Sequence, residues 1–119
     1  MSEGRWDVYV RDMIDCYTRI VDYSAGLDRA EVEGAGLVHD AVLWNIAVLG
    51  EAANNVPQAV QQVHAEIPWA DIIGMRNRIV HGYGAIDDNR VWEVVREDIP
   101  ELIPLLRALL GERDEQEEP

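Results

Sequence analysis

Residues 37–54 read LVHDAVLWNIAVLGEAAN, and this stretch decides the fold. On a helix with 3.6 residues per turn, its apolar members cover most of the circumference. These members are Leu37, Ala41, Leu43, Trp44, Ile46, Ala47, Leu49 and Gly50. A helix with so wide an apolar surface is expected at the centre of a domain, with neighbours on several sides. Because Gly50 has no side chain, it would let another backbone approach closely at that point.

Helical periodicity also precedes and follows this segment. Residues 6–21 predict an amphipathic helix, whose apolar stripe consists of Trp6, Val10, Met13, Tyr17 and Ile20. Residues 23–36 are rich in Gly and Ser, so we expect a connection there, with one helical turn at residues 29–32. After the central helix, Pro57 is suited to the first position of a short helix that ends near Ala65.

Two further helices are expected after residue 68. Asp71 can cap a helix that runs through Val80 and ends at Gly82 and Gly84. Asp87 or Asp88 can cap the next helix, which holds Val91, Trp92, Val95 and Ile99.

The end of the chain continues the same pattern. Pro100 cannot donate a helical hydrogen bond, so a kink or a restart is expected there, with Asp98 as the new cap. Residues 102–110 complete the apolar stripe, and no stretch alternates as a strand would. The sequence predicts an all-α antiparallel up-and-down bundle of four to five helices. Residues 1–110 are expected to form one domain, and residues 111–119 an acidic, disordered tail.

Charge and composition narrow the possible functions. The 119 residues carry a net charge of −13, which argues against a sequence-independent nucleic-acid binder with a basic surface. No apolar run approaches the roughly 20 residues of a membrane span, and no secretory signal is evident, so a soluble cytoplasmic protein is expected. The single cysteine, Cys16, is expected to be a small buried residue.

Residues 76–83 read RNRIVHGY and stand apart from the acidic remainder, because residues 75–84 hold two arginines, one histidine and no carboxylate. Cleavage of a phosphodiester without a metal needs a group that moves protons near neutral pH and a cation that stabilises charge on the phosphoryl oxygens. His81 and Arg76 supply these groups. Residues five apart lie about 140° from each other on an ideal helix. Arg76 and His81 therefore converge only if the turn before Gly82 loosens, or if they meet across a dimer. Alternatively, both side chains could simply cap the end of the helix.

Neighbouring residues allow several interpretations. Asn77 and Arg78 are candidates for phosphate binding, or they could be ordinary surface residues. Glu51 could hold Arg76 or His81 by an ion pair, or could only solvate a helix end. His39 and His64 are at no metal-ligand spacing and are expected on the surface, and no metal site or cofactor is expected. Trp44, Trp69 and Trp92 are expected in the core or at a dimer contact.

The segment 76–83 resembles the Arg-x4-His-x-Tyr motif of the HepT-like branch of the HEPN domains. Other stretches agree with this family in their order along residues 5–110: 40–42, 49–53, 67–69 and 72–75 before the motif, and 86–87, 91–92 and 99–100 after it. The family often has a basic residue where this chain has Trp44. That difference either weakens the nuclease interpretation or moves a phosphate contact to Arg78.

The resemblance implies a homodimeric helical bundle in which two motifs face a shared cleft. HepT-like proteins are ribonuclease toxins paired with a minimal nucleotidyltransferase antitoxin, which attaches AMP to the motif tyrosine. By this resemblance Arg76 and His81 are catalytic and Tyr83 accepts AMP. Asn77 and Arg78 remain candidates for phosphate binding, and Glu51 for support of the site. The expected function is therefore that of a metal-independent endoribonuclease toxin acting on RNA.

A non-catalytic alternative stays open, in which the chain is a nucleotide- or protein-binding subunit of a nucleotidyltransferase complex. A structural dimer with a relic motif is the third possibility.

Overall fold

All the regular structure that the computed structural model describes is helical. The description covers residues 5–25, 36–82 and 86–117, with side chains as far as Gly111. Five α-helices precede the last one: α1 (Trp6–Ser24), α3 (Gly36–Asn55), α4 (Gln58–Val63), α5 (Trp69–His81) and α6 (Asp88–Glu93). A π-helical turn, η3 (Val94–Asp98), joins α6 to α7 (Ile99–Glu117). The helical turn expected at residues 29–32 lies outside the described part of the chain.

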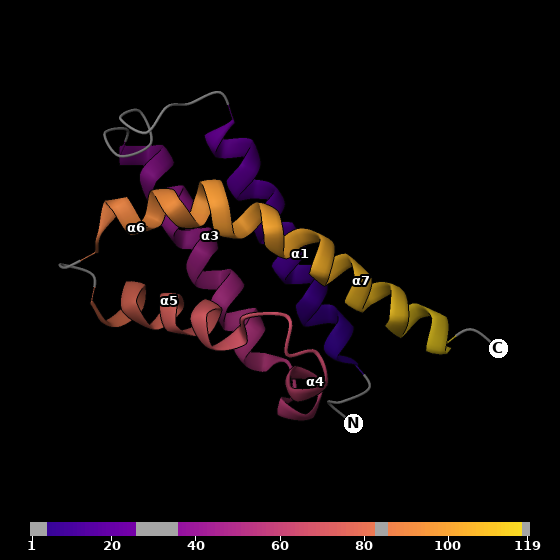
Figure 1. The fold of residues 1–119 in the computed structure, drawn as a ribbon. Coiled ribbons are helices and arrows are strands. Elements are labelled where there is room, and N and C mark those ends of the chain that lie inside the picture. Colours follow the sequence, from indigo (N-terminus) through magenta and orange to yellow (C-terminus); the bar gives the residue numbers. More distant parts are fainter. Residues whose placement is uncertain (1–4, 26–35, 83–85, 118–119) are drawn as a thin grey trace.

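The helices form a bundle that is closed on three sides. In Figure 1, α1 and α3 run antiparallel, and α6, η3 and α7 make one long rod that crosses them. Helix α3 packs on both α1 and α5, and α1 also packs on α7. No comparably close backbone contact joins α5 to the rod of α6, η3 and α7 among the described residues. The fourth side of the bundle is therefore open between α5 and this rod.

The core consists of two adjoining clusters along the bundle. One cluster gathers the first half of α1, the end of α3 and most of α7, and includes Met13, Cys16 and Leu106. The other gathers the end of α1, the start of α3, α5 and the α6–η3 segment around Val42 and Ile46. Cys16 is 1% exposed, which confirms its prediction as a small buried residue. The central position expected for residues 37–54 is also confirmed, because α3 contributes to both clusters.

Gly50 is the point of closest approach between α3 and α5. A Cβ atom added at Gly50 would overlap the Cβ of Arg76 and lie 2.9 Å from the carbonyl oxygen of Ile72. Only a residue without a side chain can stand there unless α5 moves away. The close approach expected at Gly50 is thus confirmed, and its neighbour is the helix that carries residues 76–81.

The turn between α3 and α5 is held by side chains of α4 and its flanks. Gln61 Nε2 donates hydrogen bonds to the carbonyl oxygens of Ala53, at 3.2 Å, and Val56, at 3.0 Å, so it satisfies acceptors at the end of α3. Trp69 Nε1 donates to the carbonyl oxygen of His64 at 3.0 Å. The prediction that Asp71 caps α5 is wrong: the helix begins at Trp69, Pro68 occupies the cap position, and Asp71 lies in the first turn. There the carboxylate favours the positive end of the helix dipole.

At Pro100 the α-helical pattern is interrupted as expected, but by a π-helical turn rather than by a new cap at Asp98. Proline removes one helical N–H, and its ring clashes with the carbonyl four residues earlier. Here the π-helical turn η3 lies directly before it, and the N–H of Ile99 bonds to the carbonyl of Val94, five residues back. The wider turn lets the helix continue without a new cap. Asp98 accordingly caps nothing and instead pairs with Arg90 at 3.1 Å.

Helix α7 reaches Glu117, beyond Leu110, while the division into a domain of residues 1–110 and a tail stays a prediction. In the part of the chain that the structure describes, no helix has the length and apolar character to cross a membrane.

Replacing Gly50 by alanine tests the close approach. We expect Gly50→Ala to lower the free energy of unfolding by about 1–3 kcal/mol, as overpacking of a tight contact does. Gly74→Ala on α5 is the matched control, because a Cβ there meets nothing within 4 Å. It should raise the free energy of unfolding by up to about 1 kcal/mol through helix propensity. Urea unfolding followed by circular dichroism measures both, and equal effects of the two variants would contradict the contact.

Candidate functional site

Arg76 lies on α5 directly over Gly50, with its side chain 28% exposed. Its Nη2 atom is 3.1 Å from Oε2 of Glu51, and its Nη1 atom donates to Oδ1 of Asn77 at 2.8 Å. Of the roles considered for Glu51, the structure therefore has the ion pair with Arg76. The guanidinium is held in place from two sides, yet it retains donors for a further acceptor, since it has five N–H groups.

His81 is the last residue of α5 and is exposed. The final turn does not loosen: the N–H of Gly82 bonds to the carbonyl oxygen of Arg78 at 2.8 Å, four residues back as in a regular α-helix. Arg76 and His81 are therefore about 140° apart around the helix axis. Sequence analysis offered two ways for these side chains to converge, a loosened turn before Gly82 or a meeting across a dimer. The loosened turn is absent.

Arg78 lies on the opposite side of α5 from Arg76. It lines a pocket of about 240 Å³ together with Met75 and Ile79 of α5 and with Gly82, the cap residue of that helix. The first residues of α6 complete the lining. The structure thus brings Arg76, Asn77 and Glu51 together and separates Arg78 from them. Tyr83 lies outside the described residues.

Exposed apolar side chains flank the Arg76–Glu51 pair. Trp44 is 70% exposed and precedes Glu51 by seven residues, which is two helical turns, so both lie on one face of α3. Val80 is 49% exposed and follows Arg76 by one turn on α5. Trp44 is therefore no core residue of the single chain, whereas Trp69 is 6% exposed and belongs to the core as expected. We call Trp44, Glu51, Arg76 and Val80 the α3–α5 face.

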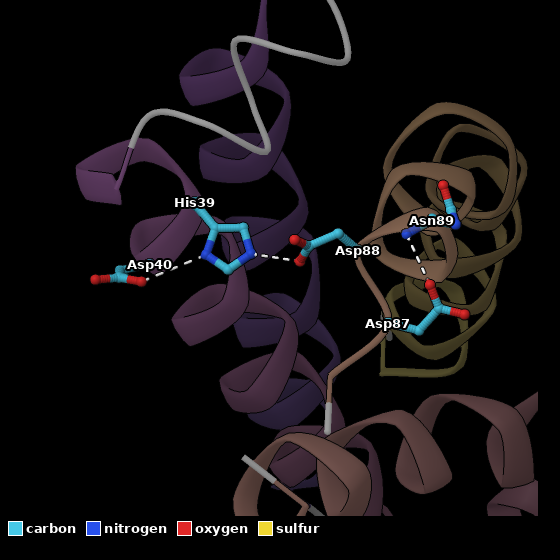
Figure 2. Close-up of polar contacts among 5 residues, drawn as sticks. All are labelled: His39, Asp40, Asp87, Asp88 and Asn89. Atoms are coloured by element: carbon cyan, nitrogen blue, oxygen red, sulfur yellow. Dashed lines mark hydrogen bonds and ion pairs between the residues drawn. The ribbon is translucent and has the colours of Figure 1, made fainter. Parts of the chain in front are cut away.

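A side-chain link that sequence analysis missed lies at the other end of α3. His39 Nε2 is 2.7 Å from Oδ1 of Asp88, and His39 Nδ1 is 3.4 Å from Oδ1 of Asp40 (Figure 2). His39 is a partly buried surface residue, because 19% of its side chain is exposed. Asp88 begins α6, and Asp87 caps that helix by accepting from the N–H of Asn89 at 2.9 Å. The link therefore ties the start of α3 to the start of α6.

The environment of His39 favours its charged form. Burial of the imidazole opposes the charge, but hydrogen bonds to Asp88 and Asp40 and the negative charges of both carboxylates outweigh it, so the pKa of His39 is raised above 6.5. Both ring nitrogens can donate only in the imidazolium form, which suits two carboxylate neighbours. Residue order offered no signal for a pair 49 positions apart.

No cluster of three or more metal-binding side chains occurs among the described residues. The His64 side chain is 15% exposed, so this histidine is also a partly buried surface residue, and its Nδ1 lies 3.5 Å from Oε1 of Glu66. The chemistry available around α5 therefore consists of arginine, imidazole, amide and carboxylate groups.

One protein-family model and several curated relatives match this chain. The family model described as "Ribonuclease HepT-like" matches residues 13–109. A protein of Thermococcus cleftensis named as a probable ribonuclease HepT is 39% identical over 62 residues, which are 52% of this chain and 56% of that relative. The match thus spans little more than half of that protein.

Two relatives carry provisional names as RNases. One, from Methanocaldococcus jannaschii, is 24% identical over 86% of this chain and 94% of its own length. The other, from Caldanaerobacter subterraneus, is 31% identical over 59% of this chain and 62% of its own length. No solved structure matches.

The His39–Asp88 link should make stability depend on pH. A pKa raised in the folded state stabilises the fold fully below the unfolded value of about 6.5, and this contribution is lost as the pH rises through the folded pKa. Asp88→Asn should therefore cost more stability at pH 5.5 than at pH 8. Urea unfolding at both values measures the difference, and NMR titration should show a lower pKa of His39 in the variant. Asp40→Asn, at the longer distance, is the control with a smaller effect, and a pH-independent cost of Asp88→Asn would contradict the link.

Proposed function

Since the chain belongs to the HepT-like ribonuclease family, we propose that it is a metal-independent endoribonuclease whose site combines Arg76 of one subunit with His81 of another. The observation that carries the proposal is the geometry of α5. The helix is regular through His81, so on one chain the two groups leave the helix about 140° apart, which favours a partner subunit as the source of the second group. A two-fold dimer that buries the α3–α5 face would supply the missing partner to each group.

The chemistry is a transesterification. The His81 imidazole takes the proton from a ribose 2′-hydroxyl, the 2′-oxygen attacks phosphorus, and the bond from phosphorus to the 5′-oxygen breaks. A proton then goes to the leaving 5′-oxygen, so the products are a 2′,3′-cyclic phosphate and a 5′-hydroxyl. Arg76 stabilises the charge that develops on the non-bridging oxygens. The requirement for a 2′-hydroxyl selects RNA over DNA.

Glu51 and Asn77 act as positioning residues for Arg76 in this scheme. Their contacts, at 3.1 and 2.8 Å, orient the guanidinium before substrate arrives. An ion pair of partly exposed side chains contributes only about 0–1 kcal/mol, so a phosphate can take over part of it. Asn77 also offers an amide N–H to the phosphate. Arg78 would contact RNA away from the reacting bond, because it lies on the other side of α5.

The α3–α5 face supports the dimer. A tryptophan that is 70% exposed and a valine that is 49% exposed flank the Arg76–Glu51 pair, and large apolar side chains near a functional group are typical of an interface. Trp44 would then anchor the dimer where other members of the family often carry a basic residue.

We also assign a regulatory partner by family membership. A minimal nucleotidyltransferase antitoxin would attach AMP to Tyr83, two residues after His81, and both proteins would act in the cytoplasm. An attached AMP carries a phosphodiester charge and a base, so it would occupy the cleft intended for the RNA backbone. Because the chain has a net charge of −13, a partner with basic contact surfaces is favoured over an acidic one.

Mixing two inactive variants tests the shared site. Arg76→Ala and His81→Ala should each abolish RNA cleavage in the presence of a chelator. A dimer of one Arg76→Ala chain and one His81→Ala chain keeps a single intact pair, so random exchange of subunits should restore about a quarter of wild-type activity. Gel analysis of RNA fragments ending in a 2′,3′-cyclic phosphate measures the recovery. No recovery after proven subunit exchange would contradict a site shared between subunits.

Trp44→Glu provides the control for dimerisation. A carboxylate in place of this exposed indole should disrupt the interface without touching the core, so the variant should sediment as a monomer and lose activity. The equally exposed Val63, which is 76% exposed on α4 and away from the α3–α5 face, can be changed to Glu as the matched variant. It should remain an active dimer.

Modification of Tyr83 is tested by co-expression with a minimal nucleotidyltransferase. The peptide that holds Tyr83 should gain the mass of AMP, and the modified protein should no longer cut RNA. Tyr83→Phe should escape both effects and keep its cleavage activity. Continued silencing of Tyr83→Phe would contradict this mode of control.

The acidic charge and the exposed Trp44 favour a second candidate, a non-catalytic subunit of a nucleotidyltransferase complex. Stable co-purification with AMP on Tyr83, combined with no cleavage by the unmodified dimer, would establish it.

A further inference from the structure

The open side of the bundle forms an apolar groove. It has a volume of about 320 Å³ and runs between α5 and the η3–α7 segment, with α3 as its floor. Its walls and floor are aliphatic, provided by Ile46, Leu49, Ile72, Met75, Leu102 and Leu105. A groove of this kind leaves apolar surface that a further helix could cover.

The groove is on a different side of α5 from Arg76. Met75 and Arg78 face the open side, whereas Arg76 packs over Gly50 and pairs with Glu51. The smaller pocket of about 240 Å³ shares Met75 and Arg90 with the groove and extends it to Gly82 at the end of α5. The two pockets therefore form a path along the whole of α5. A molecule bound there would not compete for the α3–α5 face.

Carboxylates predominate at the rim of the groove. Glu66, Asp71 and Glu101 lie at the end nearest the start of α5 and of α7, and all three are exposed. Asp98 also lies on the rim, where it is 3.1 Å from Arg90, and Arg90 is equally close to Glu93. The basic side chain of Arg90 is thus neutralised locally, and the mouth of the groove keeps a negative field.

We propose that this groove docks an amphipathic helix of a partner protein, with aliphatic residues on one face and Lys or Arg beside them. The aliphatic face would cover Ile72 and Leu105, and the basic residues would meet Asp71 and Glu101. A partner protein fits the groove better than a second copy of this chain, because the rim carboxylates Asp71 and Glu101 favour a basic helix and this chain has 23 acidic residues against 10 basic ones. The docking does not depend on ribonuclease activity, so either can fail without the other.

A partner helix in the groove would also restrain α5, the helix that carries Arg76 and His81. The groove and the α3–α5 face lie on two sides of one helix. The close backbone contacts of α5 are with α3, whereas Met75 and Ile79 meet the α6–η3 segment through side chains. A helix seated in the groove would close the fourth side of the bundle and restrain α5 along its length. The partner would therefore contact the helix that carries Arg76 and His81 without covering either residue.

A designed peptide can serve as the probe. It has about 16 residues with Leu at helical spacing on one face and Lys beside it, and a matched peptide has Glu in place of every Lys. Fluorescence anisotropy with the full chain at physiological salt should show saturable binding of the basic peptide and none of the acidic one. The double variant Asp71→Asn/Glu101→Gln should weaken binding about tenfold through the loss of two ion pairs.

Matched control variants distinguish specific binding in the groove from non-specific attraction of the basic peptide to an acidic surface. Asp12→Asn/Asp22→Asn removes the same charge from exposed positions of α1, which lines no part of the groove, and should change the affinity less than twofold. Leu105→Ser should weaken binding strongly, whereas Val21→Ser, at a site 38% exposed on α1, should not. Circular dichroism checks that every variant is folded.

Three outcomes would overturn the proposal. Equal weakening by the α1 and rim variants would show non-specific attraction. Absence of saturable binding would show that the groove accepts no basic helix. A dimer that dissociates on Leu105→Ser would identify a second copy as the occupant.

Discussion

The steric contact at Gly50 is the constraint on which the candidate site depends. At this residue the backbone of α3 is so close to α5 that a Cβ would overlap that of Arg76. The approach fixes the distance between the two helices and also the rotation of α5 about its axis. Once Arg76 stands over Gly50, its guanidinium reaches Glu51, the next residue of α3, at 3.1 Å. The remaining residues of the motif follow from the helical period, which directs Val80 outward beside Arg76 and Arg78 to the far side.

The regularity of α5 has a consequence for catalysis. A helix that keeps its α-type hydrogen bonds through Gly82 cannot present residues five apart to one small substrate. Enzymes with such a spacing must either distort the helix or take the second group from elsewhere. In this chain the exposed Trp44 and Val80 beside Arg76 favour a second subunit as the source. The same rotation leaves the opposite side of α5 free, so catalysis and docking can use separate surfaces of one helix.

Electrostatics restrict what the chain can bind. A net charge of −13 repels RNA in general, so binding must come from a few directed donors rather than from a basic surface. In the proposed function Arg76 is such a donor. Its ion pair with Glu51 orients the guanidinium and lowers its attraction for polyanions. Around His39, the carboxylates do the opposite: they retain positive charge on an imidazole that links α3 to α6. Acidic residues thus position cations in both places, and at the groove they select for a basic partner.

The helices and the close approach at Gly50 were correctly predicted, because they depend on residue types that lie close together along the chain. The period of apolar residues predicted α1, α3, α5 and the C-terminal helices, and the absence of a side chain at Gly50 predicted the close approach of another backbone. The caps predicted at Asp71 and Asp98 were wrong, because Pro68 is the cap residue of α5 and a π-helical turn leads directly into α7. Each of these ends is decided by backbone hydrogen bonds that the residue type alone does not determine.

What the sequence by itself determined is therefore the helices, the central place of α3 and the candidate residues of the motif. Only the tertiary structure decided which of those residues meet. It pairs Arg76 with Glu51 and directs Arg78 toward a pocket. It also links His39 to Asp88 across 49 positions and leaves a groove along one side of the bundle. The physical reason is that helical periodicity is a local property of the chain. The rotation and separation of packed helices, in contrast, are set by contacts between segments that are distant in sequence.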